Sequence, residues 1–265
     1  MIDINQVKQH YNRTIDLYSK YLGDFIQAGT LKNEYLTGNV NPYHQTIKWL
    51  LRDMEVKSGM RILDAGCGLC GPAIFLASSY NNIYIDAVTI SEEQVKYSQK
   101  SINESNLTDR IKVILADYHH LPYNDNNFDA IFFFESIGYS SNHNILFKEI
   151  SRVLKPNGYV YIKDVFVKEE KLSEDERCEI KNFNTVFQQL TPRRSKLQKV
   201  IEDLNFKIKF SRNLSQYLDY SFFYKSMKTQ IDDHIVIDEI SDYKYFRYEN
   251  LPVYFGDIAA IKESK

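Results

Sequence analysis

The 265-residue chain predicts an α/β fold, a Rossmann-like, doubly wound, mostly parallel seven-stranded sheet. Three observations support this fold class. Beyond about residue 60, short apolar runs alternate with amphipathic stretches. The run Ile131–Phe134 is apolar at every position, as in a strand that is buried on both faces. Three of the ten glycines lie within residues 66–71, between a predicted strand and a predicted helix.

Residues 1–58 are expected to form an N-terminal helical cap. Apolar side chains recur there at steps of three and four residues, which is the spacing of one helix face. This stripe comprises Ile4, Val7, Tyr11, Ile15, Tyr18 and Leu22. A second helix is predicted over Ile47–Met54.

Residues 59–210 are expected to form the core. Strands are predicted at Arg61–Ala65, Ile83–Val88, Ile111–Ala116, Phe128–Phe134 and Tyr159–Val165. Helices are predicted at Pro72–Ser79, Glu92–Asn103 and Asn144–Leu154. Because strand and helix alternate, the strands should run parallel, with helices packed on the sheet.

The C-terminal part is predicted to complete the sheet. Helices are expected at Glu174–Asn184 and Lys196–Leu204, and an alternating strand at Phe206–Phe210. The last strand of the core, Val253–Ile261, lies within residues 251–265. Between these last two strands, residues 211–250 form an aromatic-rich insertion. We expect it to act as a lid over the carboxyl ends of the strands, where open α/β sheets bind ligands.

The charge balance excludes one class of function. Lys and Arg total 33 and Asp and Glu total 35, so a nucleic-acid partner recruited by net charge is not expected. Three cysteines form no disulfide framework, which favours a reducing, cytoplasmic location. The polar residues 1–10 predict no signal peptide, and the longest apolar run, Ala130–Phe134, is too short to span a membrane. Oligomeric state is left open.

The glycine loop is the strongest motif. The spacing Gly66-x-Gly68-x-x-Gly71 lets the backbone turn sharply and lets a ligand approach it closely. It also satisfies the dinucleotide fingerprint, with Asp86 twenty residues further on, so an NAD-dependent oxidoreductase remains a remote alternative. Asp64 argues against that alternative because its carboxylate would repel a pyrophosphate and suits an uncharged or cationic ligand end.

These residues resemble motif I of the class I S-adenosylmethionine (SAM) methyltransferases. Three later segments are similar to that family in the same order: Val88–Gln94, Ala116–Tyr118 and Val153–Gly158. The resemblance implies that SAM is the cofactor. It also implies that the cofactor is bound by Asp64, Gly66, Cys67, Gly68, Thr89, Ile90, Gln94, Asp117, Tyr118 and Glu135.

The second of these segments departs from the family pattern. Many members end the second strand with an acid that holds both ribose hydroxyls, and here Thr89 stands at that position. Either Thr89 or Gln94 replaces the acid. Gln94 is equally explained by the capping box Ser91-x-x-Gln94. Asp117 is expected to accept a hydrogen bond from the adenine amine, with Tyr118 as its flat apolar neighbour.

Two pairs of metal-binding residue types carry no metal prediction. Cys67-x-x-Cys70 has no second cysteine pair or histidine cluster to complete a site, so both are interpreted as small loop residues. The adjacent pair His119–His120 is interpreted as polar surface, because neighbouring side chains on a loop diverge. No metal is therefore predicted from the sequence.

The segment after the fourth strand points to the acceptor. Glu135 follows four apolar residues, so it faces the crevice or needs a partner. Base-methylating enzymes of this fold carry Asn/Asp-Pro-Pro-Tyr/Phe there, which this chain lacks. Glu135-Ser-x-x-Tyr139 instead resembles the geranyl-diphosphate C-methyltransferases and, more loosely, the sterol and tocopherol C-methyltransferases. The resemblance implies C-methylation of an isoprenoid-like alkene in secondary metabolism, with Glu135 as base and Tyr139 beside it. The alternative for Glu135 is that it holds the glycine loop in place or contacts the methionine amine of SAM.

The same resemblance implies an aromatic acceptor site. Its expected residues are Tyr18, Arg193, Arg194, Tyr217, Tyr220, Phe222 and Phe223. The two arginines would hold a diphosphate, and Mg²⁺ would follow only for such an acceptor; a surface position at a helix start explains them equally well. The other interpretations are an O- or N-methyltransferase with His44, His143 or a tyrosine as base, and a SAM-binding protein without catalysis.

Overall fold

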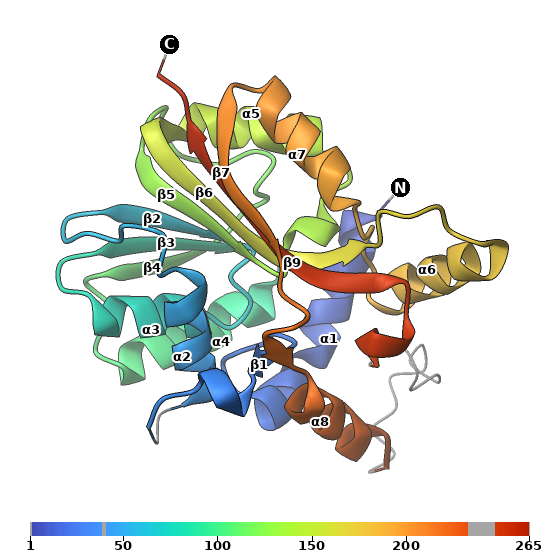
Figure 1. Ribbon diagram of the computed structural model, residues 1–265. Helices are drawn as coiled ribbons and strands as arrows, with labels where there is room; N and C mark the ends of the chain where they lie inside the picture. The colour runs from blue at the N-terminus through green and yellow to red at the C-terminus, as the bar shows by residue number, and fades with distance from the viewer. Residues whose placement is uncertain (1, 39–40, 233–246, 265) are drawn as a thin grey trace.

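A computed structural model describes residues 2–38, 41–232 and 247–264, with the backbone alone for 227–232. It contains a seven-stranded sheet in the order β4-β3-β2-β5-β6-β9-β7 (Figure 1). The strands are β2 (Arg61–Ala65), β3 (Tyr84–Thr89), β4 (Ile111–Leu115), β5 (Phe128–Phe134), β6 (Leu154–Val167), β7 (Phe206–Asn213) and β9 (Val253–Lys262). All neighbouring pairs are parallel except those made by β9. The predicted mostly parallel sheet is confirmed.

Helices cover both faces of this sheet (Figure 1). They are α1 (Ile4–Leu22), α2 (Pro42–Leu50), α3 (Gly71–Ser79), α4 (Glu92–Glu104), α5 (His143–Val153), α6 (Glu174–Val186), α7 (Arg194–Asp203) and α8 (Ser221–Asp232). Successive strand residues point to opposite faces. Phe132 therefore packs in a core with residues of α2, α3 and α4, while Phe133 packs in a second core with residues of α5 and α7.

The strand predictions hold to within one residue in the first half of the sheet. The main difference is β6, which extends to Leu154 because that residue pairs with Phe128 of β5, and to Val167 because β9 pairs with it from Tyr159 to Val167. The second helix was placed wrongly. It begins at Pro42, since Asn41 caps it through its side chain and proline fits the first helical turn.

The N-terminal cap is not helical throughout. After α1 the chain runs irregularly to the short strand β1 (Thr30–Leu31) and the 3₁₀ turn η1 (Asn33–Tyr35). Strand β1 pairs with β8 (Leu218–Asp219), which belongs to the insertion between β7 and β9. Two segments about 190 residues apart in sequence therefore lie side by side at the cap.

The insertion leaves the sheet at the end where the parallel strands finish, because β9 runs antiparallel to both of its neighbours. Besides β8 it contains α8 and the 3₁₀ turn η4 (Tyr248–Asn250). The predicted lid over residues 211–250 includes 233–246, which lie outside the described residues. For the described part, pairing with β1 places the insertion beside the N-terminal cap.

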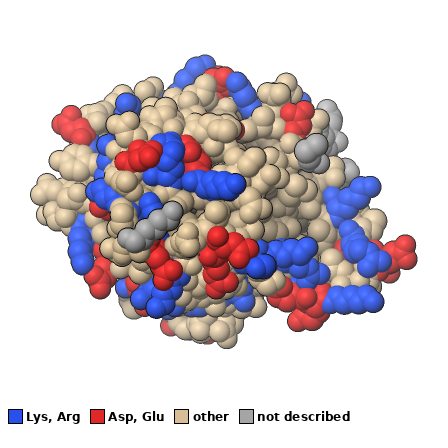
Figure 2. Space-filling model, turned by 90° about the horizontal axis from the view of Figure 1, so that it is seen from above, with Lys and Arg blue, Asp and Glu red and all other residues tan. Residues whose placement is uncertain are grey.

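Charged side chains of both signs are interspersed on the face shown in Figure 2. That face offers no broad basic surface, in agreement with the net charge of -2. Over the part of the chain that the structure describes, every helix is too short or too polar to cross a membrane.

Candidate active site

A cavity lies at the carboxyl ends of the parallel strands, with an empty space of about 850 Å³ that is partly open to solvent. Its walls come from α1, the segment after α1, the glycine loop and the ends of β3, β4 and β5. All ten predicted cofactor residues line it: Asp64, Gly66, Cys67, Gly68, Thr89, Ile90, Gln94, Asp117, Tyr118 and Glu135. Tyr139 lines the same cavity. The structure thus brings the predicted cofactor side and catalytic side together.

The glycine loop has a steric reason beyond the predicted one at two positions. Gly66 has a φ of +80°, and a Cβ there would lie 2.5 Å from the Cβ of Ser136. Gly71 has no positive φ, but a Cβ there would lie 2.5 Å from the carbonyl oxygen of Asp24. Glycine was expected to allow a sharp turn and the close approach of a ligand. The positive φ of Gly66 agrees with the turn, and at Gly66 and Gly71 a Cβ would also meet other parts of this chain.

Asp64 is a buried carboxyl group without a full set of partners. The side chain is 3% exposed, and its Oδ2 accepts no hydrogen bond from the described residues. Burial raises its pKa to about 7. A cationic or hydrogen-bond-donating end of a ligand would offset this desolvation cost, because it would pair with the unpartnered lone pairs of Oδ2.

Thr89 and Gln94 form one unit in the cavity wall. The Thr89 hydroxyl donates to Gln94 Oε1 at 2.6 Å, and the Gln94 amide nitrogen of the backbone donates to Ser91 Oγ at 3.1 Å. In a full capping box the Gln94 side chain would accept from the Ser91 amide; here Thr89 Oγ1 accepts that bond, at 3.2 Å. Ser91 therefore caps α4 by accepting from the Gln94 backbone, and the Gln94 side chain faces the cavity.

Asp86, the acid of the dinucleotide fingerprint, is used elsewhere. It accepts hydrogen bonds from Arg61 Nε at 2.7 Å and from the Tyr123 hydroxyl at 3.2 Å. It does not line the cavity. This placement removes the sequence feature that most supported a dinucleotide ligand.

Asp117 is oriented by a histidine. Its Oδ1 accepts from both the backbone amide and Nδ1 of His119, at 2.9 and 2.7 Å, while His119 Nε2 contacts Ser140 Oγ at 2.9 Å. Burial acts to raise the pKa of Asp117, but the hydrogen bonds from His119 outweigh burial and hold that pKa below its usual value. The interpretation of His119 as polar surface was wrong, because it is 9% exposed and supports the cavity wall. Tyr118 is fixed by a hydrogen bond to the carbonyl of Ser136 at 3.1 Å.

Glu135 ends β5 in a left-handed backbone conformation, with a φ of +57°. Such a conformation is unfavourable for a non-glycine residue and often marks a functional position. Its Oε2 accepts from the Ala28 amide at 2.9 Å, and its Oε1 is paired with Lys163 Nζ. Burial raises the pKa of Glu135, and Lys163 opposes that rise.

Tyr139 is paired with a residue of the N-terminal cap. The Tyr11 hydroxyl donates to the Tyr139 hydroxyl at 2.5 Å, and the two rings meet edge to face. Burial raises the pKa of both phenols well above the usual value, so both are neutral at pH 7. Tyr11 was predicted only as part of an apolar helix stripe, and its contact with the site depends on how α1 packs.

The predicted aromatic acceptor residues divide into two groups. Tyr18, Tyr220 and Phe223 are buried or nearly so beside the cavity residues; Tyr220 stacks on Phe255 with ring centres 5.1 Å apart. Tyr217 instead packs on Tyr35 and Trp49, and Phe222 is 49% exposed, against Tyr43. None of these residues lines the cavity directly.

The structure does not bring Arg193 and Arg194 to the cavity. The Arg193 guanidinium donates to the carbonyls of Lys168 and Glu170, and that of Arg194 lies 5.2 Å from the Tyr254 ring centre. Arg193 is thus engaged at the start of α7, whereas Arg194 keeps a buried Nη1 without a hydrogen-bond partner among the described residues. Within the described ranges, no three His, Cys, Asp or Glu side chains are grouped so that they could hold a metal ion.

Several residues of the site carried no sequence signal of their own. Gln27 and Ile26 line the cavity from the irregular segment after α1, and Lys163 reaches Glu135 from the middle of β6. A lysine inside the apolar run of residues 159–165 is the one signal that could have identified Lys163, since a buried charge needs a partner.

Comparison with known proteins gives one family and several relatives. The family model for mycolic acid cyclopropane synthetase matches residues 1–250. Methyltransferase GfsG of Streptomyces halstedii is 30% identical over 169 residues, 58% of this chain and 60% of that protein. Sterol 24-C-methyltransferase ERG6B of Gibberella zeae is 28% identical over 163 residues, 57% of this chain and 39% of that protein. The matched region thus spans less than two thirds of these relatives' lengths.

Solved structures share the fold. The [4+2]-cyclase SpnF superposes with a TM-score of 0.82 at 23% identity, covering 98% of this chain and 96% of that one. Geranyl diphosphate C-methyltransferase from Streptomyces coelicolor, in complex with Mg²⁺, geranyl diphosphate and S-adenosyl-L-homocysteine, gives a TM-score of 0.74 at 16% identity, with 97% of both chains covered. These structures show the fold alone. The match of the family model over residues 1–250 shows that the chain belongs to the mycolic acid cyclopropane synthetase family of SAM-dependent methyltransferases.

Proposed function

We propose that this protein transfers a methyl group from SAM to a carbon of an uncharged, isoprenoid-like alkene, with Glu135 as the base. The observation that carries the proposal is the position of Glu135. Its carboxyl group stands at the end of β5 in the wall of a cavity that it shares with Tyr11, Tyr118 and Tyr139. A carboxylate with aromatic neighbours suits a reaction that develops positive charge on carbon.

The cavity residues fit SAM. Asp64 has an unpartnered buried oxygen for a cationic end of the cofactor. The Thr89–Gln94 pair offers a neutral amide and hydroxyl to ribose hydroxyls in place of an acid. Asp117 keeps Oδ2 free of the His119 bonds to Oδ1 and can accept from the adenine amine. When bound, SAM supplies an electrophilic methyl group.

In this reaction Glu135 would accept a proton after the methyl group has been transferred. The alkene carbon forms a bond to the methyl carbon while the sulfonium–methyl bond breaks, which leaves a carbocation on the acceptor. A proton on the neighbouring carbon passes to the Glu135 carboxylate, and its bonding electrons restore the double bond. The neutral phenols of Tyr11 and Tyr139 present their rings or hydroxyls to the site without adding charge.

The described residues favour an acceptor without a diphosphate. The two arginines proposed for that group are bonded to backbone carbonyls or packed on Tyr254, away from the cavity. Lys163 is fully buried and paired with Glu135. Since these residues offer no evident diphosphate site, Mg²⁺ has no proposed role here.

O-methylation is the second candidate, supported by the hydroxyl-bearing Tyr11–Tyr139 pair in the cavity. The histidines proposed as bases for it lie elsewhere. His143 Nε2 contacts the carbonyl of Ile137 at 3.2 Å, and His44 stacks on Phe75. This distribution favours a carboxylate base, and hence carbon as the methylated atom.

The test is a screen with methyl-labelled SAM. Neutral isoprenoid alkenes, prenyl diphosphates and hydroxylated analogues are incubated with the protein, and the labelled product is located by NMR. Label on carbon of a neutral alkene is expected. Label exclusively on oxygen or nitrogen would contradict the proposal, as would binding of NADH without binding of SAM in calorimetry.

A further inference from the structure

Glu135 is part of a closed ring of hydrogen bonds. Its two carboxylate oxygens accept from Lys163 Nζ and from the Ala28 amide. Lys163 Nζ also donates to the carbonyl of Ala28, at 2.8 Å. Ala28 is therefore held through both of its backbone polar groups, by the carboxylate at its N–H and by the ammonium at its C=O.

Lys163 is an unusual residue for this position. It lies in the interior of β6, opposite Phe134 of β5, and its side chain is fully buried. Its strand neighbours on the same face, Tyr161 and Val165, belong to the apolar core. Burying an ammonium group carries a large desolvation penalty, so a lysine here is costly unless its partners compensate it. Besides the ring of bonds, Phe255 offers its aromatic face, 4.8 Å from Nζ.

The ring also reaches the glycine loop. Ala28 closes the segment in which Ile26 and Gln27 line the cavity. At the start of this segment, the carbonyl oxygen of Asp24 lies 2.5 Å from the position that a Cβ at residue 71 would take. The segment 24–28 thus packs on the loop at one end and is fastened to Glu135 and Lys163 at the other.

We propose that Lys163 is the positioning residue of this site: it keeps Glu135 ionised and oriented, and it fastens segment 24–28 over the glycine loop. This inference rests on the proposed function for its effect on catalysis. A carboxylate has about four lone-pair sites, so two remain for a proton from the acceptor. Because the Glu135–Lys163 pair has no net charge, this end of the cavity favours a neutral acceptor over an ammonium-bearing one.

Glu135 has other titratable neighbours that any pH dependence must include. Asp164 of β6 is buried, and burial followed by the Glu135 charge raises its pKa to about 7. Tyr43 of α2, Tyr220 and Tyr248 also have pKa values raised by burial and then by the charge of Glu135. Lys163 is the cation that lowers the pKa of Glu135, against the rise caused by burial.

The catalytic test compares Lys163→Met with Lys168→Met. Lys168 is also an ion-paired lysine, but it lies just after β6 and pairs with Glu176, away from the cavity. In Lys163→Met the acid limb of the pH–rate profile should move upward by about one unit or more, so that the activity lost on this limb is regained at higher pH. Lys168→Met should keep the wild-type profile. An unmoved acid limb in an active Lys163→Met variant would overturn the proposal.

A second test needs no acceptor and separates this inference from the proposed function. The stabilities of wild type, Glu135→Gln, Lys163→Met and the double variant are compared by denaturant unfolding, with hydrogen exchange at the Ala28 amide. We expect the double variant to be more stable than Lys163→Met, because the single change leaves a buried carboxylate without its cation. Faster exchange at Ala28 is expected in Lys163→Met and not in Lys168→Met.

The outcomes are distinct. If wild type methylates no alkene but the double variant rescues Lys163→Met, the proposed function fails and the positioning role stands. Additive stabilities with unchanged Ala28 exchange would overturn the positioning role. Should Lys163→Met fail to fold, folding of the double variant supports the role, and failure of both overturns it.

Discussion

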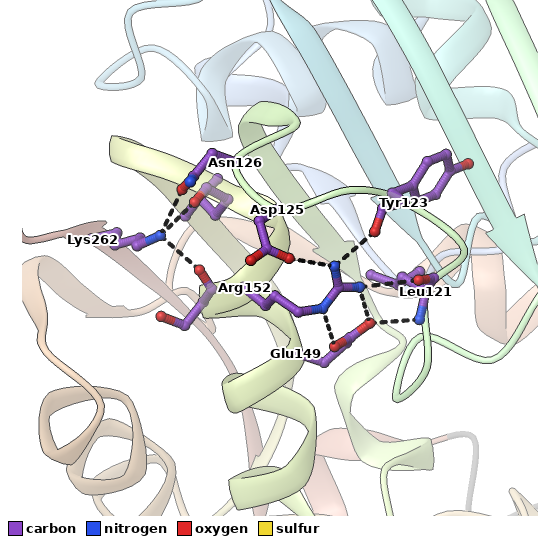
Figure 3. A network of polar contacts seen from close by, with 9 residues as sticks. Leu121, Tyr123, Asp125, Asn126, Glu149, Arg152 and Lys262 are labelled. Atoms are coloured by element: carbon purple, nitrogen blue, oxygen red, sulfur yellow. Dashed lines mark hydrogen bonds and ion pairs between the residues drawn. The ribbon is translucent and has the colours of Figure 1, made fainter.

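Charged side chains at the two ends of the sheet differ in how fully they are hydrogen-bonded. At the amino ends of β5 and β6, Arg152 of α5 donates all five of its N–H groups (Figure 3). The acceptors are the carboxylates of Glu149 and Asp125 and the carbonyls of Leu121 and Tyr123. Glu149 in turn accepts from the Leu121 amide at 2.7 Å.

At the carboxyl ends of β2 and β5, side chains beside the cavity keep bonding capacity that the Arg152 network does not have. Asp64 has a buried oxygen without a partner, Glu135 stands in a left-handed conformation, and both face the cavity. Buried polar groups in proteins are nearly always satisfied, so each exception needs a reason. The comparison teaches that the Arg152 end is built for stability, while the Glu135 end retains bonding capacity for a ligand.

The largest effect is expected for Glu135→Gln. Glutamine can still accept from the Ala28 amide, but it takes up no proton, so methyl transfer should fall by about 10²–10⁴-fold. The measurement is single-turnover transfer from methyl-labelled SAM, with SAM affinity determined by calorimetry.

Glu149→Gln is the matched control at the other end of the sheet. It should lower the unfolding temperature and leave the rate of methyl transfer within about twofold, because neither Glu149 nor its partners Arg152 and Leu121 line the cavity. Full turnover by Glu135→Gln would remove the base assignment.

The next effect is expected for Asp64→Asn and for pH. The Asp64 pKa of about 7 means that wild type should bind SAM more weakly as the pH falls below 7, where the carboxylate becomes protonated. Asp64→Asn should weaken binding by about 10–100-fold and abolish that pH dependence. Calorimetric titrations between pH 6 and about pH 8.5 check both points.

The same substitution should change stability in the opposite direction. The folded protein holds a proton on Asp64 up to about pH 7, whereas an unfolded chain releases it near the ordinary value. Stability therefore falls as the pH rises through this window, and Asp64→Asn should regain about 1–3 kcal/mol at pH 8. A destabilised Asp64→Asn at pH 8 would show that the carboxylate is satisfied in the free protein.

A smaller effect is expected for Arg152→Met. Glu149 and two carbonyls lose their donor, and because the arginine side chain is 34% exposed, water replaces part of the loss. The cost should be about 1–3 kcal/mol in the free energy of unfolding. Urea unfolding measures it. At about 20 °C below the melting temperature of the variant, its SAM affinity should equal that of wild type. A large loss of affinity would show that the two ends of the sheet are coupled.

The smallest effect is expected for Gln94→Leu. The variant keeps the backbone bond to Ser91 that caps α4, but it removes the acceptor of the Thr89 hydroxyl. SAM affinity should fall by about 2–10-fold, with little change in stability. Gln9→Leu, on the exposed side of α1, is the control. An unchanged affinity in Gln94→Leu would assign the ribose contact to another group.

Much of the fold could be predicted, because each core strand and helix is specified by its own residues. The boundaries of β2 and β5 agree with the predicted ones, since a short, mostly apolar run between turns marks a buried strand. The prediction failed at α2, where a capping asparagine and a proline outweigh the apolar spacing, and in the cap, where β1 exists only through its pairing with β8.

The candidate site was predictable on the cofactor side and less so on the acceptor side. Thr89 ends β3, and Gly66, Asp117 and Glu135 come shortly after β2, β4 and β5. Parallel strands bring such positions to one edge of the sheet. The acceptor residues were inferred from their aromatic character in an insertion. Aromatic side chains are equally at home in a core, so composition did not separate Tyr220 from the exposed Phe222.

Local periodicity and motifs of a few residues were enough to predict the α/β fold, the strand-end positions of the cofactor residues and the family resemblance. Packing in three dimensions was needed to bring Tyr11 to Tyr139, to let His119 orient Asp117, and to let Lys163 and Ala28 hold Glu135. Apart from the local His119–Asp117 bond, these contacts join residues far apart in the chain. Their partners are selected by packing and by the need to satisfy buried charge, which no local pattern encodes.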